Sequence, residues 1–294
     1  MHPDRLKRGA LQTAKRAALA AFLIATISGA GAEPTRPQRI VSINLCADEL
    51  LLRLADRKRI ASVTRLSQDA GNSNVAALAA GLPVNHGLAE EVMAMRPDVV
   101  LAGVYSPQNT VGILRRLGVN VVEFDIPNSL DDVRSEIRRL AAAIGEPERG
   151  EALVRAMDAR FATLAQRAPA PPLRAVVLRP NGITAGKGSL VEDIMARAGL
   201  ENLAARLDAG NYLQIPLEAV ALQGADVLIV DGESDGPPSL ATETLAHPIV
   251  AALGRRVRIV SMPAKLWTCG GPNLVEAAER LVAATRGGGG ASAR

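Results

Sequence analysis

The chain has 294 residues, of which 48% are hydrophobic, 22% are charged and only 2% are aromatic. This length allows one large α/β domain or two lobes of ordinary size, and the composition is that of a globular protein with an ample core. The net charge is +4, but residues 1–32 hold five basic residues against one acidic residue, which accounts for all of it. Because the remainder has 29 basic and 29 acidic residues, it offers no electrostatic footprint for a polyanion, and we expect no nucleic-acid partner.

The first 32 residues have the three parts of a secretory signal peptide. A basic start is followed by the apolar run Ala17–Ile27 and then by the small residues Ala30-Gly31-Ala32. The apolar run is shorter than the roughly 20 residues that span a bilayer. We therefore predict cleavage after Ala32 and an extracytoplasmic location, with a periplasm as the expected compartment. The alternative is a short buried or amphipathic N-terminal helix.

Strand and helix patterns alternate along the rest of the chain. In the first half, short apolar runs predict strands and amphipathic segments predict helices. The expected strands are 39–43, 60–63, 98–102 and 119–124, and the expected helices are 49–54, 111–117 and 131–144. In the second half, the expected strands are 175–178, 226–230 and 257–260, and the expected helices are 189–198 and 273–284. Because the two types alternate, we expect mostly parallel sheets.

The segment 146–168 is predicted to form one long connecting helix. Its proline, Pro147, stands in the tolerated first turn, and the proline-rich segment 169–172 ends the helix. The predicted organisation is a signal peptide at 1–32, an N-terminal βα lobe at 33–145, a connecting helix at 146–168, a C-terminal βα lobe at 169–286 and a disordered tail at 287–294.

A weak internal repeat supports two related lobes. The segment Glu90–Leu101 aligns with Glu218–Ile229, and in each a Glu precedes a short helix while an Asp opens the apolar strand that follows. The alternative is that both segments follow the general pattern of a helix that enters a buried strand.

With these elements in order, the chain resembles the periplasmic substrate-binding proteins of iron-chelate and cobalamin ABC importers. The resemblance covers residues 39–285 and is carried by Arg39–Ile43, Glu90–Ala102, Leu117–Val121, Gly186–Leu190 and Leu266–Pro272. It implies an α/β fold of two Rossmann-like lobes, with mostly parallel sheets, joined by one long helix. It also implies that the protein delivers a metal-chelate ligand, such as a ferric siderophore, cobalamin or haem, to an ABC importer permease at the inner membrane. We further expect a monomer that is not an enzyme and needs no cofactor.

The resemblance implies that the ligand lies between the lobes, on loops that follow the strands. Tyr105, Tyr212 and Trp267 match loop positions at the rim of that cleft. Since aromatic residues are scarce in this chain, these three are expected to form a platform for a flat, partly apolar ligand. The alternative is local packing or chance exposure.

Polar residues and both cysteines match further positions of the cleft. Arg65 and Arg179 follow predicted strands, and His86 stands just before the predicted helix that carries Glu90. An arginine at the position of Arg179 suits the carboxylates of a siderophore or a porphyrin. Arg65 and His86 replace lip aromatics of the cobalamin-binding members, so the identity of the ligand does not carry over. Cys46 and Cys269 fall in predicted cleft loops, one in each lobe. They line the pocket, form a disulfide across it, or remain two small buried thiols.

Two acidic residues match the pair with which the family docks onto arginines of the permease. Glu90 and Glu218 stand one in each predicted lobe, which suits a two-fold transporter mouth. Both also stand at predicted helix N-termini, where the helix dipole favours an acid in any case.

Three other functions are alternatives to chelate delivery: an enzyme, a binding protein for a bare metal ion and an interaction module. For an enzyme, the segment Gly182–Gly188 lacks the spacing of a phosphate loop, and only His86 and His247 remain beyond the signal peptide for acid–base chemistry. A site for bare zinc or manganese needs several converging donors, and His247 is expected to be structural because it precedes a proline in a loop. An interaction module without a small ligand is separated from the main prediction only by a ligand screen.

Overall fold

The computed structural model describes residues 36–207, 210–216, 224–231, 248, 250 and 256–286. The predicted signal peptide, the predicted tail, Glu218 and His247 lie outside the described residues. The chain divides into two compact units, Met1–Arg36 and Pro37–Arg294, and every element below belongs to the second. Within the described ranges, no helix combines the length and the hydropathy that a membrane span requires.

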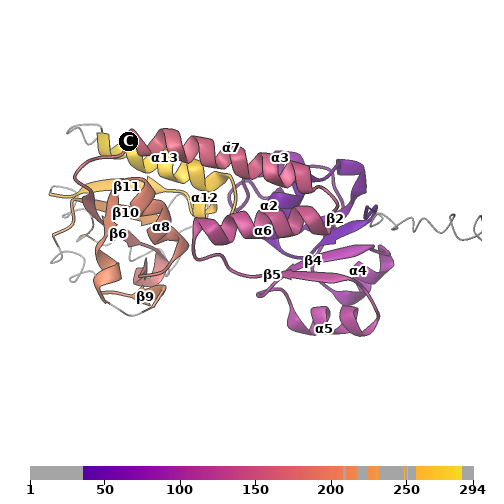
Figure 1. Cartoon of the computed structure of the whole chain (residues 1–294). Coiled ribbons are helices and arrows are strands. Elements are labelled where there is room, and N and C mark those ends of the chain that lie inside the picture. The colour runs from indigo at the N-terminus through magenta and orange to yellow at the C-terminus, as the bar shows by residue number, and fades with distance from the viewer. Residues whose placement is uncertain are drawn as a thin grey trace, which may run out of the picture. The chain divides into compact units, whose positions relative to one another are not determined.

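A five-stranded parallel sheet forms the first half of this unit (Figure 1). Its strands, in the order β3-β2-β1-β4-β5, are β3 (Val84–Asn85), β2 (Ile60–Thr64), β1 (Ile40–Ser42), β4 (Val99–Gly103) and β5 (Val121–Phe124). All residues of β1 and β4 are buried, as expected for strands of a parallel sheet that is covered on both faces. The chain runs from β1 to one edge of the sheet and returns to β4, so the carboxyl ends of β1 and β4 form a topological switch point.

Short helices cover this sheet. They are α2 (Leu45–Leu54), α3 (Ala76–Ala79), α4 (Ala89–Ala94) and α5 (Gln108–Arg116), with the 3₁₀ turns η1 (Arg57–Arg59) and η2 (Arg65–Gln68). Helix α2 begins directly after β1 because the side chain of Asn44 caps it, accepting a hydrogen bond from the Ala47 N–H at 3.0 Å. The side chains of α2 therefore start at the switch point.

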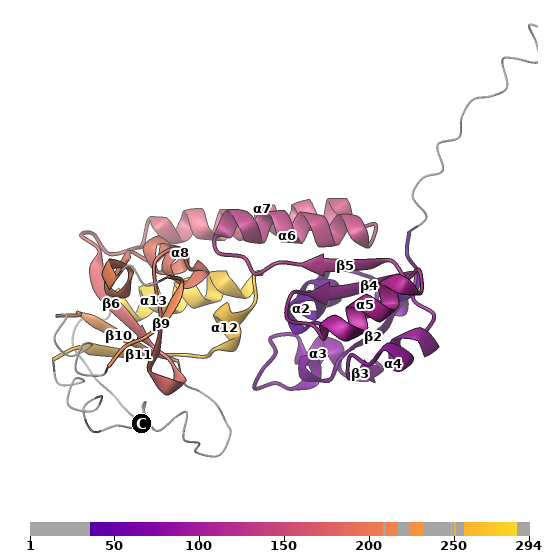
Figure 2. The same ribbon diagram turned by 90° about the horizontal axis from the view of Figure 1, so that it is seen from below.

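Two helices, α6 (Leu130–Ala143) and α7 (Pro147–Ala165), lead from the first sheet to the second. They run alongside each other in Figure 1, overlap in the view of Figure 2, and pack against one another. A Cβ on Gly150 of α7 would stand 2.5 Å from the Cβ of Ala141, so this close helix contact requires glycine. Helix α7 lies within the segment 146–168 and ends at Ala165, while the division into two lobes with a connecting helix stays a prediction.

The second sheet has four parallel strands in the order β11-β10-β6-β8. They are β11 (Arg258–Met262), β10 (Val227–Asp231), β6 (Leu173–Leu178) and β8 (Leu200–Asn202). A separate antiparallel pair joins β7 (Ile183–Ala185) to β9 (Tyr212–Gln214). The other elements are α8 (Leu190–Arg197), α12 (Lys265–Thr268), α13 (Asn273–Arg286), η3 (Pro180–Gly182) and η4 (Leu203–Leu207).

The predicted α/β class with mostly parallel sheets is confirmed, and one hydrophobic core serves both sheets. Helix α13 packs against α7, α8 and β11, while α6 packs against α2, α7 and α8. The same core cluster contains Leu101 of the first sheet, Phe161 of α7 and Val177 of the second sheet. The four helices α6, α7, α8 and α13 therefore connect the two sheets through continuous apolar packing.

Candidate functional site

A cavity of about 230 Å³ opens at the carboxyl ends of β1, β4 and β5, next to the switch point of the first sheet. Asn44 and Cys46 follow β1, Tyr105 follows β4, and the segment 124–127 follows β5. Thr268, the last residue of α12, and Gly270, which lies between α12 and α13, also line the cavity. Residues from both halves of the described unit therefore meet around one hollow.

The walls of this cavity are mainly apolar. The apolar lining residues are Ala47, Leu50, Val104, Phe124, Ile126, Pro127 and Leu140. The carboxyl of Glu136 also lines the cavity, and its burial raises its pKa against the opposing effect of Arg139, which donates to it at 3.0 Å. Since the cavity is smaller than the sites that hold whole drug-sized ligands, it suits an apolar edge of a larger molecule rather than an anionic group.

A second group of predicted residues lies at the end of β6. The Arg179 guanidinium stands over the ring of Tyr212, 5.4 Å from its centroid, and over the ring of Trp267, 5.7 Å from its centroid. Tyr212 is 47% exposed, whereas Trp267 is 2% exposed. The structure thus brings three of the predicted ligand residues together, with a cation held by the faces of one exposed and one buried ring.

The prediction that Tyr212 and Trp267 stand in loops is wrong, and Trp267 is buried rather than exposed at a rim. Tyr212 lies in β9, and Trp267 lies in α12. The backbone N–H groups of Trp267 and Thr268 donate to the Ala264 carbonyl at 3.1 and 3.0 Å, and this turn places the indole in the core. Its Nε1 is buried and has no hydrogen-bond partner in the part of the chain that the structure describes.

Cys46 and Cys269 form a disulfide, with an S–S distance of 2.07 Å and a Cα–Cα distance of 5.0 Å. Cys46 lies in the first turn of α2 rather than in a loop, and Cys269 is the residue after α12. Of the three alternatives for the cysteines, the structure has the cross-link, and Cys46 also lines the 230 Å³ cavity. The disulfide therefore ties the segment of Thr268 and Gly270 to α2, and both line the 230 Å³ cavity.

The remaining predicted residues lie on the surface. Tyr105 stands in a turn after β4 and is 84% exposed, at the cavity of Cys46. Arg65 is exposed at the start of η2, and His86 is exposed with its Nδ1 3.0 Å from Oε1 of Glu91. The structure does not bring Arg65 or His86 to the wall of the cavity or to the rings around Arg179, so their role in binding stays a prediction.

Glu90 is exposed in the first turn of α4, beside Glu91, whose pKa is held below its usual value by hydrogen bonds from His86. The backbone N–H of His86 donates to Oε2 of Glu91 at 2.7 Å. Glu91 is thereby tied back to the preceding loop, which leaves Glu90 as the outward acid of this turn.

Sequence reasoning missed two features near the cavity. Asp48, in the first turn of α2, is buried and accepts hydrogen bonds from the N–H of Thr64 at 3.0 Å and from its hydroxyl at 2.5 Å. Asn211, next to Tyr212, donates from Nδ2 to Oδ1 of Asn128 at 2.7 Å and so joins the second half to the loop before α6. For Asp48 the sequence did offer a signal, because Asp48, like Asn44, stands between the predicted strand 39–43 and the predicted helix 49–54.

Among the described residues, no group of three or more His, Cys, Asp or Glu side chains is placed to hold a metal ion.

Comparison with known proteins gives a consistent set of matches. A family described as "periplasmic binding protein" matches residues 40–263. A cobalamin-binding protein of Halobacterium salinarum is 24% identical over 262 residues, which are 84% of this chain and 69% of the relative.

Two solved structures share the fold. The periplasmic heme-binding protein RhuT of Roseiflexus sp. RS-1, in its apo form, is 24% identical with a TM-score of 0.66, and the match covers 85% of this chain and 99% of RhuT. The periplasmic vitamin B12 binding protein BtuF of Vibrio cholerae is 20% identical with a TM-score of 0.64, and the match covers 86% of this chain and 99% of BtuF.

Proposed function

Because the chain belongs to the periplasmic binding protein family, we propose that it is the substrate-binding protein of an ABC importer for a metal chelate. The ligand is a ferric siderophore, cobalamin or haem, in line with the names of the relatives that bind cobalamin and heme. The protein works in the periplasm after cleavage behind Ala32, as a monomer without catalytic activity, and passes the ligand to the permease at the inner membrane.

The observation that carries this proposal is the pairing of an apolar cavity with an arginine held by two aromatic rings. A flat macrocycle or a siderophore combines apolar edges with acidic groups. The 230 Å³ cavity beside Tyr105 suits an apolar edge, and the forked N–H donors of Arg179 suit a carboxylate. Tyr212 and Trp267 keep the guanidinium plane in a fixed orientation, so less side-chain entropy is lost when an anion binds.

Trp267 supplies the test, because it is the only tryptophan of the chain. Haem, cobalamin and a ferric siderophore are titrated separately into the mature protein while tryptophan fluorescence is recorded. One of the three is expected to quench the emission to saturation at one ligand per chain. Quenching by none of them would contradict the proposal.

A matched pair of variants tests the role of Arg179. Arg179→Gln is expected to weaken binding of a carboxylate-bearing chelate by about 10- to 100-fold, because a charge-assisted hydrogen bond is lost. Arg197→Gln is the control, since that guanidinium also stands over an aromatic ring, 5.8 Å from the centroid of Phe161. If both variants weaken binding equally, Arg179 has no special role in the site.

We also propose that Glu90 and Glu218 dock the protein onto the permease. What supports this is the exposed position of Glu90 beside Leu88, which is 47% exposed. The double variant Glu90→Ala, Glu218→Ala is expected to lose chelate uptake in cells while the purified protein keeps its affinity for the ligand. Glu148→Ala, at another exposed acid in the first turn of a helix, is the control. Unchanged uptake by the double variant would rule out the docking role.

A further inference from the structure

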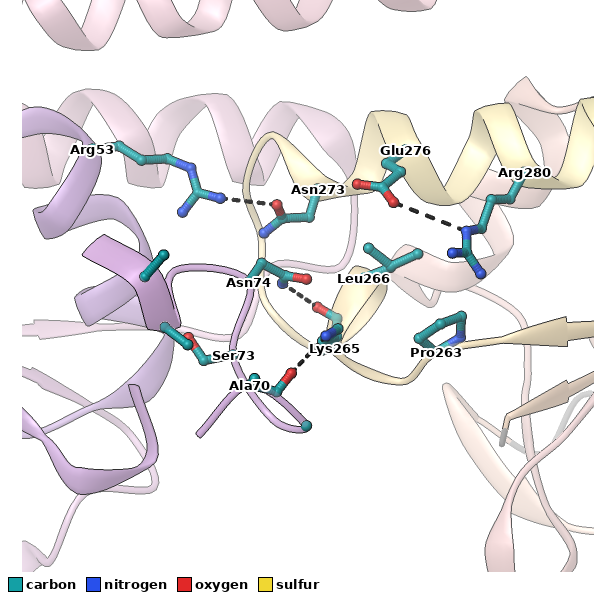
Figure 3. A pocket seen from close by; sticks show the side chains of 13 residues that line it. Arg53, Ala70, Ser73, Asn74, Pro263, Lys265, Leu266, Asn273, Glu276 and Arg280 are labelled. Carbon is teal, nitrogen blue, oxygen red and sulfur yellow. Dashed lines mark hydrogen bonds and ion pairs between the residues drawn. The ribbon is translucent and has the colours of Figure 1, made fainter. Parts of the chain in front are cut away.

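A second cavity, of about 580 Å³, lies between α2, the loop before α3 and the segment from α12 to α13 (Figure 3). Among the described residues, it has no lining residue in common with the 230 Å³ cavity. Helix α12 divides the two, because Lys265 and Leu266 line the larger cavity and Thr268 lines the smaller one. All of the residues that were predicted to bind the chelate lie in the described part of the chain, and none of them lines the larger cavity.

The wall of the larger cavity is strongly basic. Arg53 of α2, Lys265 of α12 and Arg280 of α13 line it, against a single carboxylate, that of Glu276 (Figure 3). Most other lining residues are small or polar, namely Ala70, Gly71, Ser73, Asn74, Ala76, Ala77 and Asn273. Three cations from three separate elements therefore face one hollow with an excess of positive charge.

Arg53 and Lys265 are held in place by neutral acceptors. Arg53 donates from Nη2 to Oδ1 of Asn273 at 3.0 Å and from Nη1 to the Glu49 carbonyl at 2.8 Å. Lys265 donates from Nζ to the Ala70 carbonyl at 2.6 Å. These bonds position both cations without neutralising them, and burial lowers the pKa of Arg53 while the charge of Glu49 opposes that effect.

The carboxylates of Glu49 and Glu276 do not cancel the positive charge of the three basic side chains on the cavity wall. Glu49 stands behind the wall and accepts hydrogen bonds from the side-chain amides of Asn74 at 2.9 Å and Asn273 at 2.5 Å. Glu276 is 3.9 Å from Arg280, and both side chains are about half exposed, so this ion pair is weak. An additional anion in the hollow would offset the repulsion among the three cations.

We propose that this cavity is a second binding site, for a small multivalent anion that carries carboxylate or phosphate groups and bridges α2 to α12 and α13. The volume lies in the range of small-molecule sites, and guanidinium forks match the oxygen pairs of carboxylates and phosphates. The anion binds separately from the chelate, on the other side of α12.

Calorimetric titration of citrate and of inorganic phosphate into the full-length protein at low salt tests the site. At least one of the two is expected to bind at one per chain and to raise the melting temperature. Binding of citrate alone assigns a polycarboxylate, and binding of phosphate alone assigns a phosphate-bearing ligand.

Four variants separate a built site from general electrostatic attraction. Arg280→Gln is expected to weaken anion binding about tenfold or more, and Glu276→Gln to tighten it, because each changes one charge on the wall. Arg286→Gln makes the same change of charge on the same helix outside the cavity, and it is expected to leave the affinity unchanged. Lys265→Gln is an independent second variant, on a different element of the wall, with the same expected loss.

The site is refuted if neither anion binds at millimolar concentration, or if Arg286→Gln weakens binding as much as Arg280→Gln. The Trp267 titration with the chelates, repeated on Arg280→Gln, is expected to match that of the unmodified protein. Calorimetry thus tests the anion site and tryptophan fluorescence tests the chelate site, so the failure of one proposal is distinguishable from the failure of the other.

Discussion

At the scale of a single residue, Asp48 has the most unusual electrostatic environment of the described carboxyls. Its side chain is fully buried, its Oδ2 accepts both hydrogen bonds from Thr64, and its Oδ1 has no hydrogen-bond partner among the described residues. Burial disfavours the carboxylate and raises the pKa to about 7 from 3.8, against the opposing effect of hydrogen bonds to Ser42 and Thr64. Asp48, the residue after Ala47 in the wall of the 230 Å³ cavity, therefore has a pKa near neutral pH.

This environment predicts a pH-dependent stability. Between about pH 4 and pH 7 the unfolded chain has lost the Asp48 proton while the folded chain keeps it, so the free energy of unfolding falls as the pH rises and then levels off. Asp48→Asn is expected to remove this slope. It should stabilise the protein by about 2–4 kcal/mol at pH 8 and change little at pH 4.

Urea denaturation at pH 4, 6 and 8 measures the effect. Asp125→Asn, the same change at an exposed carboxyl, is the control and should leave the slope in place. Parallel pH profiles for Asp48→Asn and the unmodified protein would contradict the prediction.

At the scale of an element, the start of α7 is fixed by a buried ion pair. Glu146 precedes the helix and pairs with Arg59 of η1, and both side chains are 2% exposed. Arg59 also donates to the carbonyls of Ile144 and Pro37. One guanidinium thus joins η1, the end of α6 and the start of the long helix.

Removing the acid from this pair is expected to be costly. Glu146→Gln should lower the free energy of unfolding by about 3–5 kcal/mol, because it leaves the Arg59 charge buried without its counter-ion. Glu148→Gln, at an exposed position of the same turn, should change it by less than about 0.5 kcal/mol. The double variant Arg59→Met, Glu146→Leu should recover most of the loss, and equal effects of Glu146→Gln and Glu148→Gln would show that the pair contributes nothing.

At the scale of the whole molecule, polar contacts and one covalent bond join the two halves beside the shared core. Asn74 donates to the Lys265 carbonyl at 2.7 Å, and the Leu130 N–H donates to Oδ2 of Asp193 at 2.7 Å. The disulfide Cys46–Cys269 connects α2 to the end of α12 across a sequence separation of 223 residues. These links cross between the halves at α2, at α6 and beside both cavities.

The cross-link is expected to stabilise the fold because it restricts the unfolded chain. Cys46→Ser with Cys269→Ser should lower the free energy of unfolding by about 2–5 kcal/mol, and dithiothreitol should do the same to the unmodified protein. Urea denaturation with and without the reductant measures both effects, and the double variant serves as the control that does not respond to it. Two thiols that alkylate freely in the unreduced protein would show that the bond is absent.

Much of the element order was predictable because buried parallel strands leave long apolar runs. The strands β1, β2, β4, β5, β6, β10 and β11 coincide with such runs. By contrast, β3, β7, β8 and β9 lie in no comparable apolar run, and they exist because a neighbouring strand pairs with them.

The candidate site was predictable in its parts but not in its arrangement. The candidate residues after β1, β4 and β6 were identified through the family resemblance, which agrees with the rule that ligands bind at the carboxyl ends of parallel strands. The position of Arg179 over the rings of Tyr212 and Trp267 was not predictable from the sequence. It depends on a short helix and a short strand that form only through tertiary packing. The choice among the alternatives for Cys46 and Cys269 likewise needed the spatial distance between two distant segments.

The long span of the disulfide also sets an order of events during biosynthesis. Cys46 emerges early, but its partner lies 223 residues further along the chain, so the bond forms only after both residues have been made and have reached an oxidising compartment. A product that stops before Cys269 keeps Cys46 as an unmatched thiol, open to pairing with other molecules. Oxidation of this pair is therefore a late event relative to synthesis of the first sheet, whose strands all precede Cys269.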